Sequence, residues 1–201
     1  MGLQNATLID NQSYITPSWT QTGLLCFNLA QNIISKKIHI DRLIALADGG
    51  LTWSKALLDY LDVSKLSTLQ VKFYQDIGKT NNRPIIVQSL ATAVQNETVL
   101  LFDDVVDSGE TVKIAKEYLL MCGAKKVYTS SLFIKDWVQT KPDFYAANTS
   151  SWIIFPHEIR EMIKLLYSKW KKERVSENEI KKRLVRIGIS KKEVDYFIKI
   201  I

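Results

Sequence analysis

The sequence predicts an α/β fold in which an open, mostly parallel, twisted sheet is covered by helices on both faces. Two short segments, 43–47 and 99–102, are apolar at every position, which is typical of strands that are buried on both faces of a parallel sheet. Segments with helical and strand patterns alternate through most of the chain, as they do in βαβ units. The 201 residues are 46% hydrophobic and 24% charged, a composition typical of a globular protein.

The first half of the chain opens with a helix that Ser18 can cap and that continues to Ile33 with apolar residues four positions apart. The apolar strand 43–47 follows. A helix over 51–61 and a strand over 69–74 come next. Residues 75–84 contain almost no apolar side chain, so we expect an exposed loop there.

The second half continues the alternation. After the strand 99–102 we expect a helix over 109–122 with apolar side chains on one side, and Gly123 is placed to end it. A strand over 127–134 and a short strand over 144–147 follow. The sequence therefore predicts one α/β domain over residues 1–170.

The last segment, 171–201, is predicted to be a basic helical hairpin attached to this domain. Ser176 with Glu179, and Ser190 with Glu193, have the spacing of capping boxes that open short amphipathic helices. Lys and Arg crowd the final third of the chain, so the net charge of +6 describes the hairpin more than the main domain. The hairpin is either a nucleic-acid contact or a solvated cationic surface that packs through Ile180, Leu184, Val194 and Phe197.

The remaining composition indicates a protein of the reducing cytoplasm. Cys26 and Cys122 are isolated thiols without metal-binding spacing, and we expect both to be buried in the core. No apolar run approaches the length needed to cross a bilayer. The first ten residues lack the charged and apolar regions of a signal peptide.

The segment that carries most chemical information runs from Val99 to Thr111. Two adjacent carboxylates, Asp103 and Asp104, follow the buried strand, where a bending strand end can turn both toward one ligand. A vicinal diol requires acceptors of this kind. The turn Asp107-Ser108-Gly109-Glu110-Thr111 then offers hydroxyl groups and the free N–H groups of a helix start to an anion. Together these groups predict a site for ribose 5-phosphate, and an acidic Mg²⁺ site of a phosphatase or receiver is the alternative.

This segment resembles the phosphoribosyl pyrophosphate signature of the type I phosphoribosyltransferases, and the similarity extends over roughly residues 14–160. The resemblance implies that Asp103 and Asp104 bind the ribose hydroxyls, with Mg²⁺ as the cofactor at these two carboxylates. It implies that Ser108, Gly109, Glu110 and Thr111 bind the 5-phosphate and that Asp107 lies near the base. Asp48, Gly49 and Gly50 correspond to the pyrophosphate loop of the family, and residues 75–84 correspond to a mobile lid.

One residue departs from the family pattern. Relatives usually carry Lys or Arg in the pyrophosphate loop, whereas this chain carries Asp48. A carboxylate that faces a pyrophosphate repels it unless Mg²⁺ lies between them or the side chain points away. We expect the backbone N–H groups of Asp48, Gly49 and Gly50 to bind the pyrophosphate, with Lys79 or Arg83 closing over it.

The residues that would recognise the base resemble those of the xanthine-guanine and hypoxanthine-guanine enzymes. Lys135 ends a strand where those enzymes place the lysine that donates to a purine 6-oxo group. Trp152 would stack on the purine, and the carbonyl of Ile153 could accept from a 2-amino group. A cationic donor favours an oxo acceptor over the amino group of adenine.

We therefore predict a Mg²⁺-dependent purine phosphoribosyltransferase of purine salvage that acts on guanine, hypoxanthine or xanthine, with Asp107 as the catalytic residue. The expected partners are phosphoribosyl pyrophosphate, the base and the product nucleotide, in a homodimer or homotetramer. Neither a membrane nor nucleic acid is expected as a partner. The alternatives are a transferase for adenine or a pyrimidine, and a regulator that senses phosphoribosyl pyrophosphate and binds nucleic acid.

Overall fold

The structure is a computed structural model that describes residues 6–74 and 83–201. By its internal contacts the chain forms two compact units, which are described separately here. The sheet unit spans Gly23–Thr149, and the helical unit combines Met1–Thr22 with Ser150–Ile201. The predicted domain boundary at residue 170 thus falls inside the helical unit, which contains the hairpin together with the strands and the helix that precede it.

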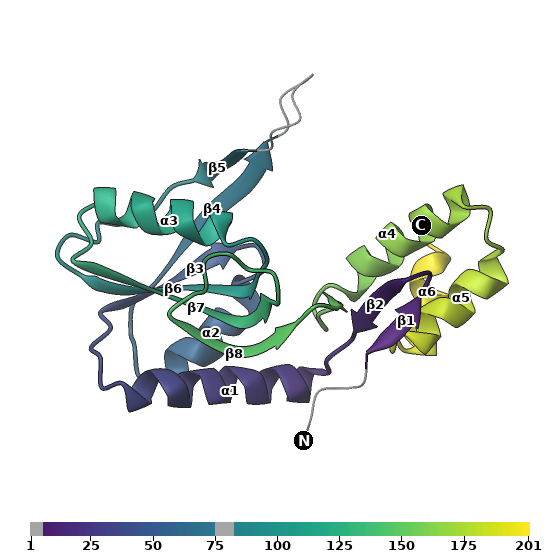
Figure 1. Cartoon of the computed structure of the whole chain (residues 1–201), viewed down its shortest axis with the longest axis horizontal. Coiled ribbons are helices and arrows are strands. Elements are labelled where there is room, and N and C mark those ends of the chain that lie inside the picture. Colours follow the sequence, from purple (N-terminus) through teal and green to yellow (C-terminus); the bar gives the residue numbers. More distant parts are fainter. Residues whose placement is uncertain (1–5, 75–82) are drawn as a thin grey trace. The chain divides into compact units, whose positions relative to one another are not determined.

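The sheet unit contains a sheet with six strands in the described residues, all parallel to their neighbours except the antiparallel pair β4 and β5 (Figure 1). This confirms the predicted α/β class with a mostly parallel sheet. In their order across the sheet the strands are β5 (Arg83–Gln88), β4 (Leu66–Tyr74), β3 (Arg42–Ala47), β6 (Thr98–Val106), β7 (Lys126–Lys135) and β8 (Phe144–Thr149).

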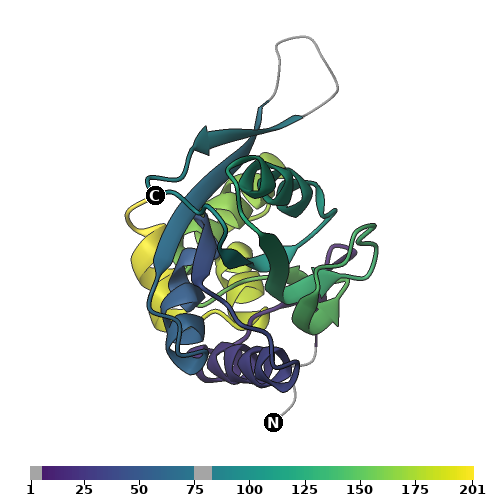
Figure 2. The same cartoon turned by 90° about the vertical axis from the view of Figure 1, so that its left-hand side faces the viewer.

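Helices cover both faces of this sheet. Figures 1 and 2 place α3 (Glu110–Met121) on one face, and α2 (Leu51–Tyr60) with α1 (Trp19–Ser35) on the opposite face. The apolar segments predicted as buried strands are buried at every position from 43 to 46 and from 99 to 102. Burial on both faces explains why these segments show no alternation of apolar and polar residues.

One core cluster fills the space between α3 and the sheet. The helix contributes Val112, Ala115 and Leu119, which meet Ile44 and Leu101 among others. Gly123 follows the helix with φ +88°, which confirms its predicted role in ending α3. Cys26 is buried as expected, whereas Cys122 is only half-buried.

The winding of the chain reverses at β3. The strand that follows it in sequence, β4, lies on one side, and β6 lies on the other side. In open α/β sheets, ligands bind outside the carboxyl ends of the strands at such a switch point. The sequence-predicted site residues after β3 and in β6 therefore lie at the edge where the fold favours a ligand.

Two predicted boundaries were wrong. The strand predicted over 99–102 continues as β6 to Val106, so Asp103 and Asp104 lie within a strand and not at its end. Arg83 and Pro84 belong to β5 and not to a loop. Pro84 is tolerated because β5 is an edge strand, where one row of backbone groups has no partner strand. The rest of the predicted loop, 75–82, lies outside the described residues.

The helical unit contains a small sheet, in which β2 (Gln12–Ile15) pairs with β1 (Thr7–Ile9) and with β9 (Trp152–Ile153). Three helices complete it: α4 (Ile159–Lys172), α5 (Glu177–Arg186) and α6 (Lys191–Ile198). The small sheet and α4 were not predicted. Both predicted serine N-caps are confirmed, because the hydroxyls of Ser176 and Ser190 accept from the backbone N–H groups of Glu179 and Glu193.

The hairpin shares a hydrophobic core with the rest of the helical unit. Ile180, Leu184 and Val194 are fully buried in one cluster with Trp170 of α4. The Asp10 carboxylate, between β1 and β2, accepts from the Trp170 indole at 3.1 Å and forms an ion pair with Arg183 of α5. The hairpin is therefore an integral part of this unit. Over the described ranges, no helix combines the length and the apolar character that a bilayer crossing requires.

Candidate functional site

The ends of β3 and β6 bring the Asp48–Gly50 loop to Asp104. The two strands are parallel neighbours, with Ala45 opposite Phe102. A Cβ atom on Gly49 would lie only 2.5 Å from Oδ1 of Asp104, a distance that real side chains do not tolerate. Glycine at this position therefore lets the loop backbone approach a buried carboxylate.

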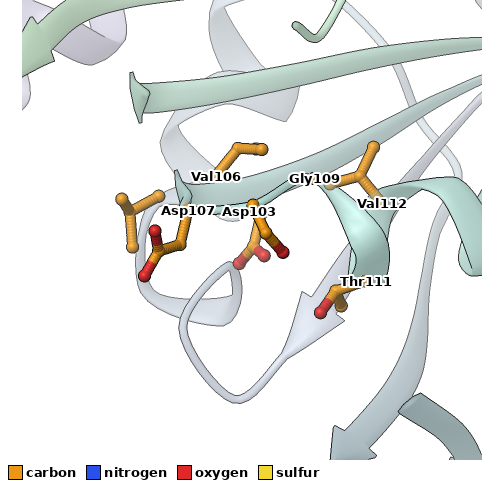
Figure 3. A pocket seen from close by; sticks show the side chains of 8 residues that line it. Asp103, Val106, Asp107, Gly109, Thr111 and Val112 are labelled. Carbon is orange, nitrogen blue, oxygen red and sulfur yellow. The ribbon is translucent and has the colours of Figure 1, made fainter. Parts of the chain in front are cut away.

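The alternation of side chains along β6 separates the two predicted ribose-binding carboxylates. Figure 3 shows that Asp103 and Asp107 point to the same side of the strand and that Val106 points to the other side. Asp103 is half-buried and lines a pocket, whereas Asp104 is 5% exposed and is absent from that pocket's lining. The backbone N–H of Asp104 donates to Oδ1 of Asp103 at 3.0 Å. Because Asp103 and Asp104 are successive residues within β6, their side chains point to opposite sides, and each carboxylate belongs to a different part of the site.

The turn between β6 and α3 forms a small pocket of about 90 Å³. Its polar lining combines Asp103, Asp107, Ser108 and Thr111 with the backbone at Gly109. The Thr111 side chain points to the same side as the two carboxylates in Figure 3. The N-terminus of α3, a helix of 12 residues, opens beside this turn, and N–H groups at a helix start suit an anion. The N–H of Glu110 donates to the Ser108 hydroxyl at 3.3 Å.

Gly109 is required by the backbone of this turn. Its φ is +93°, in the left-handed region, and a Cβ atom there would lie 2.8 Å from the carbonyl oxygen of Thr140. Only glycine combines this conformation with so close an approach. The structure thus brings together the predicted phosphate-binding residues Ser108, Gly109 and Thr111, while Glu110 begins α3 with an exposed side chain.

The Asp48 side chain has a partner on the neighbouring strand. Its Oδ1 accepts a hydrogen bond from the Gln70 amide of β4 at 3.0 Å. Gln70 lies opposite Ala47 in the β3–β4 pairing, so the carboxylate turns sideways toward β4. This contact accounts for an acidic residue in a loop where the family usually carries a base.

Lys135 ends β7 and is only 7% exposed. Burial lowers the pKa of its ammonium group, and the carboxylates of Asp107 and Asp136 oppose that effect. Its amino group lies 5.5 Å from the centre of the Trp137 ring. A buried cationic donor close to an acidic pocket is an arrangement that suits a polar, electron-rich ligand.

Trp137 belongs to this site and was missed in the sequence. Its indole Nε1 donates a hydrogen bond to Oδ1 of Asp107 at 2.5 Å. Trp137 therefore contacts both Lys135 and Asp107, which the sequence had singled out separately. In the sequence, the only sign of this residue's role was its position, two residues after the lysine that ends a predicted strand.

Other predicted site residues lie outside the sheet unit or outside the described residues. Trp152 and Ile153 form β9 of the helical unit, where they pair with Tyr14 and Ile15. Trp152 is 47% exposed and Ile153 is buried. Lys79 lies outside the described residues, as does the side chain of Arg83.

The acidic residues of β6 have the chemistry that Mg²⁺ requires. This ion prefers oxygen ligands and usually retains several waters. Asp103 offers a half-buried carboxylate at the pocket, and Asp104 offers a second one beside the loop backbone at Gly49. Both residues therefore fit the ion, each from a different side of the strand.

Comparison with known proteins gives one family. The family described as "Phosphoribosyl transferase domain" matches residues 19–161. A xanthine-guanine phosphoribosyltransferase of Gluconobacter oxydans is 26% identical over 145 residues, which are 71% of this chain and 83% of the relative. A purine phosphoribosyltransferase structure from Pyrococcus horikoshii has a TM-score of 0.64 and 31% identity, over 72% of this chain and 93% of that one. A xanthine-guanine-hypoxanthine phosphoribosyltransferase structure from Helicobacter pylori shares the fold, with a TM-score of 0.64 and 20% identity over 77% of this chain and 99% of its own.

Proposed function

The chain belongs to the phosphoribosyltransferase family, and we propose that it transfers the phosphoribosyl group of 5-phosphoribosyl pyrophosphate to a 6-oxopurine. The products are the purine nucleoside monophosphate and pyrophosphate, and the reaction serves purine salvage. Guanine, hypoxanthine and xanthine are the candidate bases. The observation that carries the proposal is the pocket between β6 and α3, where two carboxylates meet an anion-binding turn.

The phosphoribosyl half of the substrate fits this pocket. The N–H groups and hydroxyls of the turn 108–111 would bind the 5-phosphate, and Asp103 would accept from a ribose hydroxyl. Asp104 lies next to Gly49 of the loop. The backbone N–H of Gly50, predicted to bind the pyrophosphate, instead donates to the carbonyl oxygen of Leu46 at 2.8 Å. A pyrophosphate at the backbone N–H groups of Asp48 and Gly49 would lie beside this second carboxylate.

The base would lie near Lys135 and Asp107. The buried ammonium of Lys135 is a donor that an oxo group at position 6 of a purine satisfies and an amino group does not. Xanthine-guanine and purine phosphoribosyltransferases among the similar proteins support a purine. The stacking role of Trp152 and the role of the Ile153 carbonyl as acceptor from a 2-amino group stay predictions from the sequence.

In the reaction, the bond between the anomeric carbon and the pyrophosphate oxygen breaks, and a bond from a purine ring nitrogen to that carbon forms. Both electrons of the broken bond leave with pyrophosphate. Asp107 would accept the proton that the purine nitrogen loses, an effect typically worth about 10²–10⁴-fold in rate. A Mg²⁺ ion held by Asp103, or one held by Asp104 on the other side of β6, would supply neutralisation of the negative charge on the leaving group.

There are two alternatives to a phosphoribosyltransferase for 6-oxopurines. A phosphoribosyltransferase for adenine or a pyrimidine uses the same phosphoribosyl site, so only the residues near the base separate it from the proposal. A regulator that senses phosphoribosyl pyrophosphate and binds nucleic acid is favoured only by the cationic residues of the helical unit. The homodimer or homotetramer and the cytoplasmic location stay predictions.

The test is an assay of pyrophosphate release. The purified chain is given Mg²⁺ and phosphoribosyl pyrophosphate with guanine, hypoxanthine, xanthine, adenine or uracil in separate reactions. We expect release with at least one 6-oxopurine and little or none with adenine or uracil. Release with uracil or adenine alone would replace the proposal by the first alternative, and no release with any base would favour the regulator.

The first mutational prediction concerns Asp107. Asp107→Asn keeps the size of the side chain but removes the proton acceptor, so kcat should fall by about 10²–10⁴-fold. The KM for phosphoribosyl pyrophosphate should change by less than about threefold, because the 5-phosphate and pyrophosphate contacts remain. Steady-state kinetics with the preferred base measures both values, and unchanged turnover would remove Asp107 from the mechanism.

A further inference from the structure

We propose that Trp137 is a positioning residue, which holds the Asp107 carboxylate and the Lys135 ammonium in the arrangement that the base requires. The inference rests on the proposed function, because these two groups are the ones assigned to the proton and to the 6-oxo group of the purine. Trp137 contacts both of them.

The contact with Asp107 fixes an exposed side chain. Asp107 follows the last residue of β6 and is exposed to solvent, so its carboxylate would otherwise sample several rotamers. The indole N–H, which can only donate, binds Oδ1 at 2.5 Å. In the described parts of the chain no hydrogen bond reaches Oδ2 of Asp107, so this oxygen remains for the purine N–H.

The contact with Lys135 uses the face of the same ring. The amino group lies 5.5 Å from the ring centre, within the range of a cation–π interaction. Lys135 is buried, and a charged group without water needs such compensation. One indole therefore binds the acid through its edge and the cation through its face, and the two groups keep a fixed separation.

A role in folding alone would give a different pattern. Trp137 is 54% exposed and is absent from the core clusters of the described residues. Its truncation should therefore cost little stability, and an effect on turnover can be separated from unfolding. Trp19 is a matched control, because it is 55% exposed and belongs to the helical unit.

The experiment compares Trp137→Phe, Trp137→Leu and Trp19→Phe. Phe at position 137 keeps an aromatic face but lacks the N–H, so kcat should fall about tenfold, the effect of losing one hydrogen bond to a charged group. The KM values for the base and for phosphoribosyl pyrophosphate should stay within about twofold. Leu at position 137 also removes the aromatic face, so the KM for the 6-oxopurine should rise in addition. Trp19→Phe should match the wild type.

A double-mutant cycle tests whether Trp137 acts through Asp107. In the Asp107→Asn background, Trp137→Phe should lower kcat no further. Equal losses in both backgrounds, or wild-type kcat in Trp137→Phe, would overturn the inference.

A spectroscopic measurement keeps the test independent of turnover. The indole N–H resonance of Trp137 is assigned by its loss in Trp137→Phe, and it should shift in Asp107→Asn. An unshifted resonance would overturn the inference whatever the activity. Absence of pyrophosphate release in the wild type, with the shift present, would contradict the proposed function and leave the contact established.

Discussion

At the residue scale, one hydrogen bond sets the direction in which the Asp48 carboxylate points. A carboxylate in a pyrophosphate loop should repel its ligand. Its Oδ1 is bound by the Gln70 amide at 3.0 Å, which directs the side chain along the sheet toward β4. Of the three backbone N–H groups predicted for the anion, that of Gly50 donates to Leu46 at 2.8 Å, and binding by those of Asp48 and Gly49 stays a prediction.

Lys135 carries the second mutational prediction. Lys135→Ala should lower kcat/KM for a 6-oxopurine by about 10–100-fold, the effect of losing a hydrogen bond from a charged group. The loss for adenine should be much smaller, because adenine offers no 6-oxo acceptor. Steady-state kinetics with both bases measures the ratio. Lys126→Ala, at the exposed beginning of the same strand, is the control, and equal losses for both bases would remove Lys135 from base recognition.

At the scale of elements, two adjacent glycines after β3 should have different functions. On Gly49 a Cβ atom would meet the carboxylate of Asp104 at 2.5 Å, whereas on Gly50 it would meet the carbonyl oxygens of Phe102 and Leu46 at 2.6 and 2.7 Å. The first contact lies in the candidate site, and the second lies between the backbones of β3, β6 and the start of α2.

The third prediction compares alanine at these two positions. Gly50→Ala should destabilise the fold by about 1–3 kcal/mol, because backbone atoms must move. Gly49→Ala should raise the KM for phosphoribosyl pyrophosphate at least about tenfold with a smaller loss of stability. Urea denaturation and steady-state kinetics measure the two effects. A normal KM in Gly49→Ala would separate this loop from substrate binding.

An ion-pair cluster lies at the amino-terminal ends of the central strands, opposite the end that carries the candidate site. Glu97, just before β6, binds Arg42 of β3 through two hydrogen bonds of 2.7 and 3.0 Å, and binds Lys65 at 2.7 Å. The hydrogen bonds from Arg42, with the contribution of Lys65, lower the pKa of the Glu97 carboxyl to about 2. This cluster ties the beginnings of three neighbouring strands.

The fourth prediction follows from this pKa. Since the folded-state pKa lies below the unfolded value, the stabilisation is complete above about pH 5 and is lost as the pH falls toward 2. Glu97→Gln should therefore destabilise the protein by about 1–2 kcal/mol at pH 7, and the difference from the wild type should shrink between pH 5 and pH 2. Urea denaturation at a series of pH values measures this. Glu117→Gln, exposed on α3, is the control, and a pH-independent difference would contradict the assignment.

At the scale of the whole molecule, the charge is unevenly distributed along the chain. Residues 169–201 hold 11 of the 27 Lys and Arg residues and 5 of the 21 acidic residues, a surplus of six that equals the net charge of the chain. Several of these cations are already paired. Lys181 binds Glu177 at 3.0 Å, and Arg183 binds both Asp10 and Glu179.

The fifth prediction separates the proposed enzyme from the nucleic-acid-binding alternative. We expect binding to duplex DNA and to structured RNA to be weaker than about 10⁻⁴ M at physiological salt, the weak end of non-specific binding. Titrations at several salt concentrations measure it. Tight binding whose logarithm falls steeply with that of the salt concentration would show that the cations contact phosphates, and would favour the regulator.

Features that depend on residues close together in the chain could be predicted from the sequence alone. The alternation of helices and parallel strands, the turn at Gly109 and the serine N-caps at Ser176 and Ser190 follow from local pattern. The turn 107–111 could be predicted because its residues are contiguous in the chain. A strand that is buried on both faces can also be predicted, because it is a continuous run of apolar residues.

Features that join residues far apart in the chain could not be predicted from the sequence and are visible in the tertiary fold. The extension of β6 to Val106 places Asp103 and Asp104 on different sides, and the pairing with β7, which continues to Val106, sets that length. Tyr14 pairs with Trp152 across most of the chain, and Trp137, in the turn after β7, contacts Asp107 after β6. These contacts depend on which strands become neighbours, and a local sequence pattern does not specify the pairing of strands.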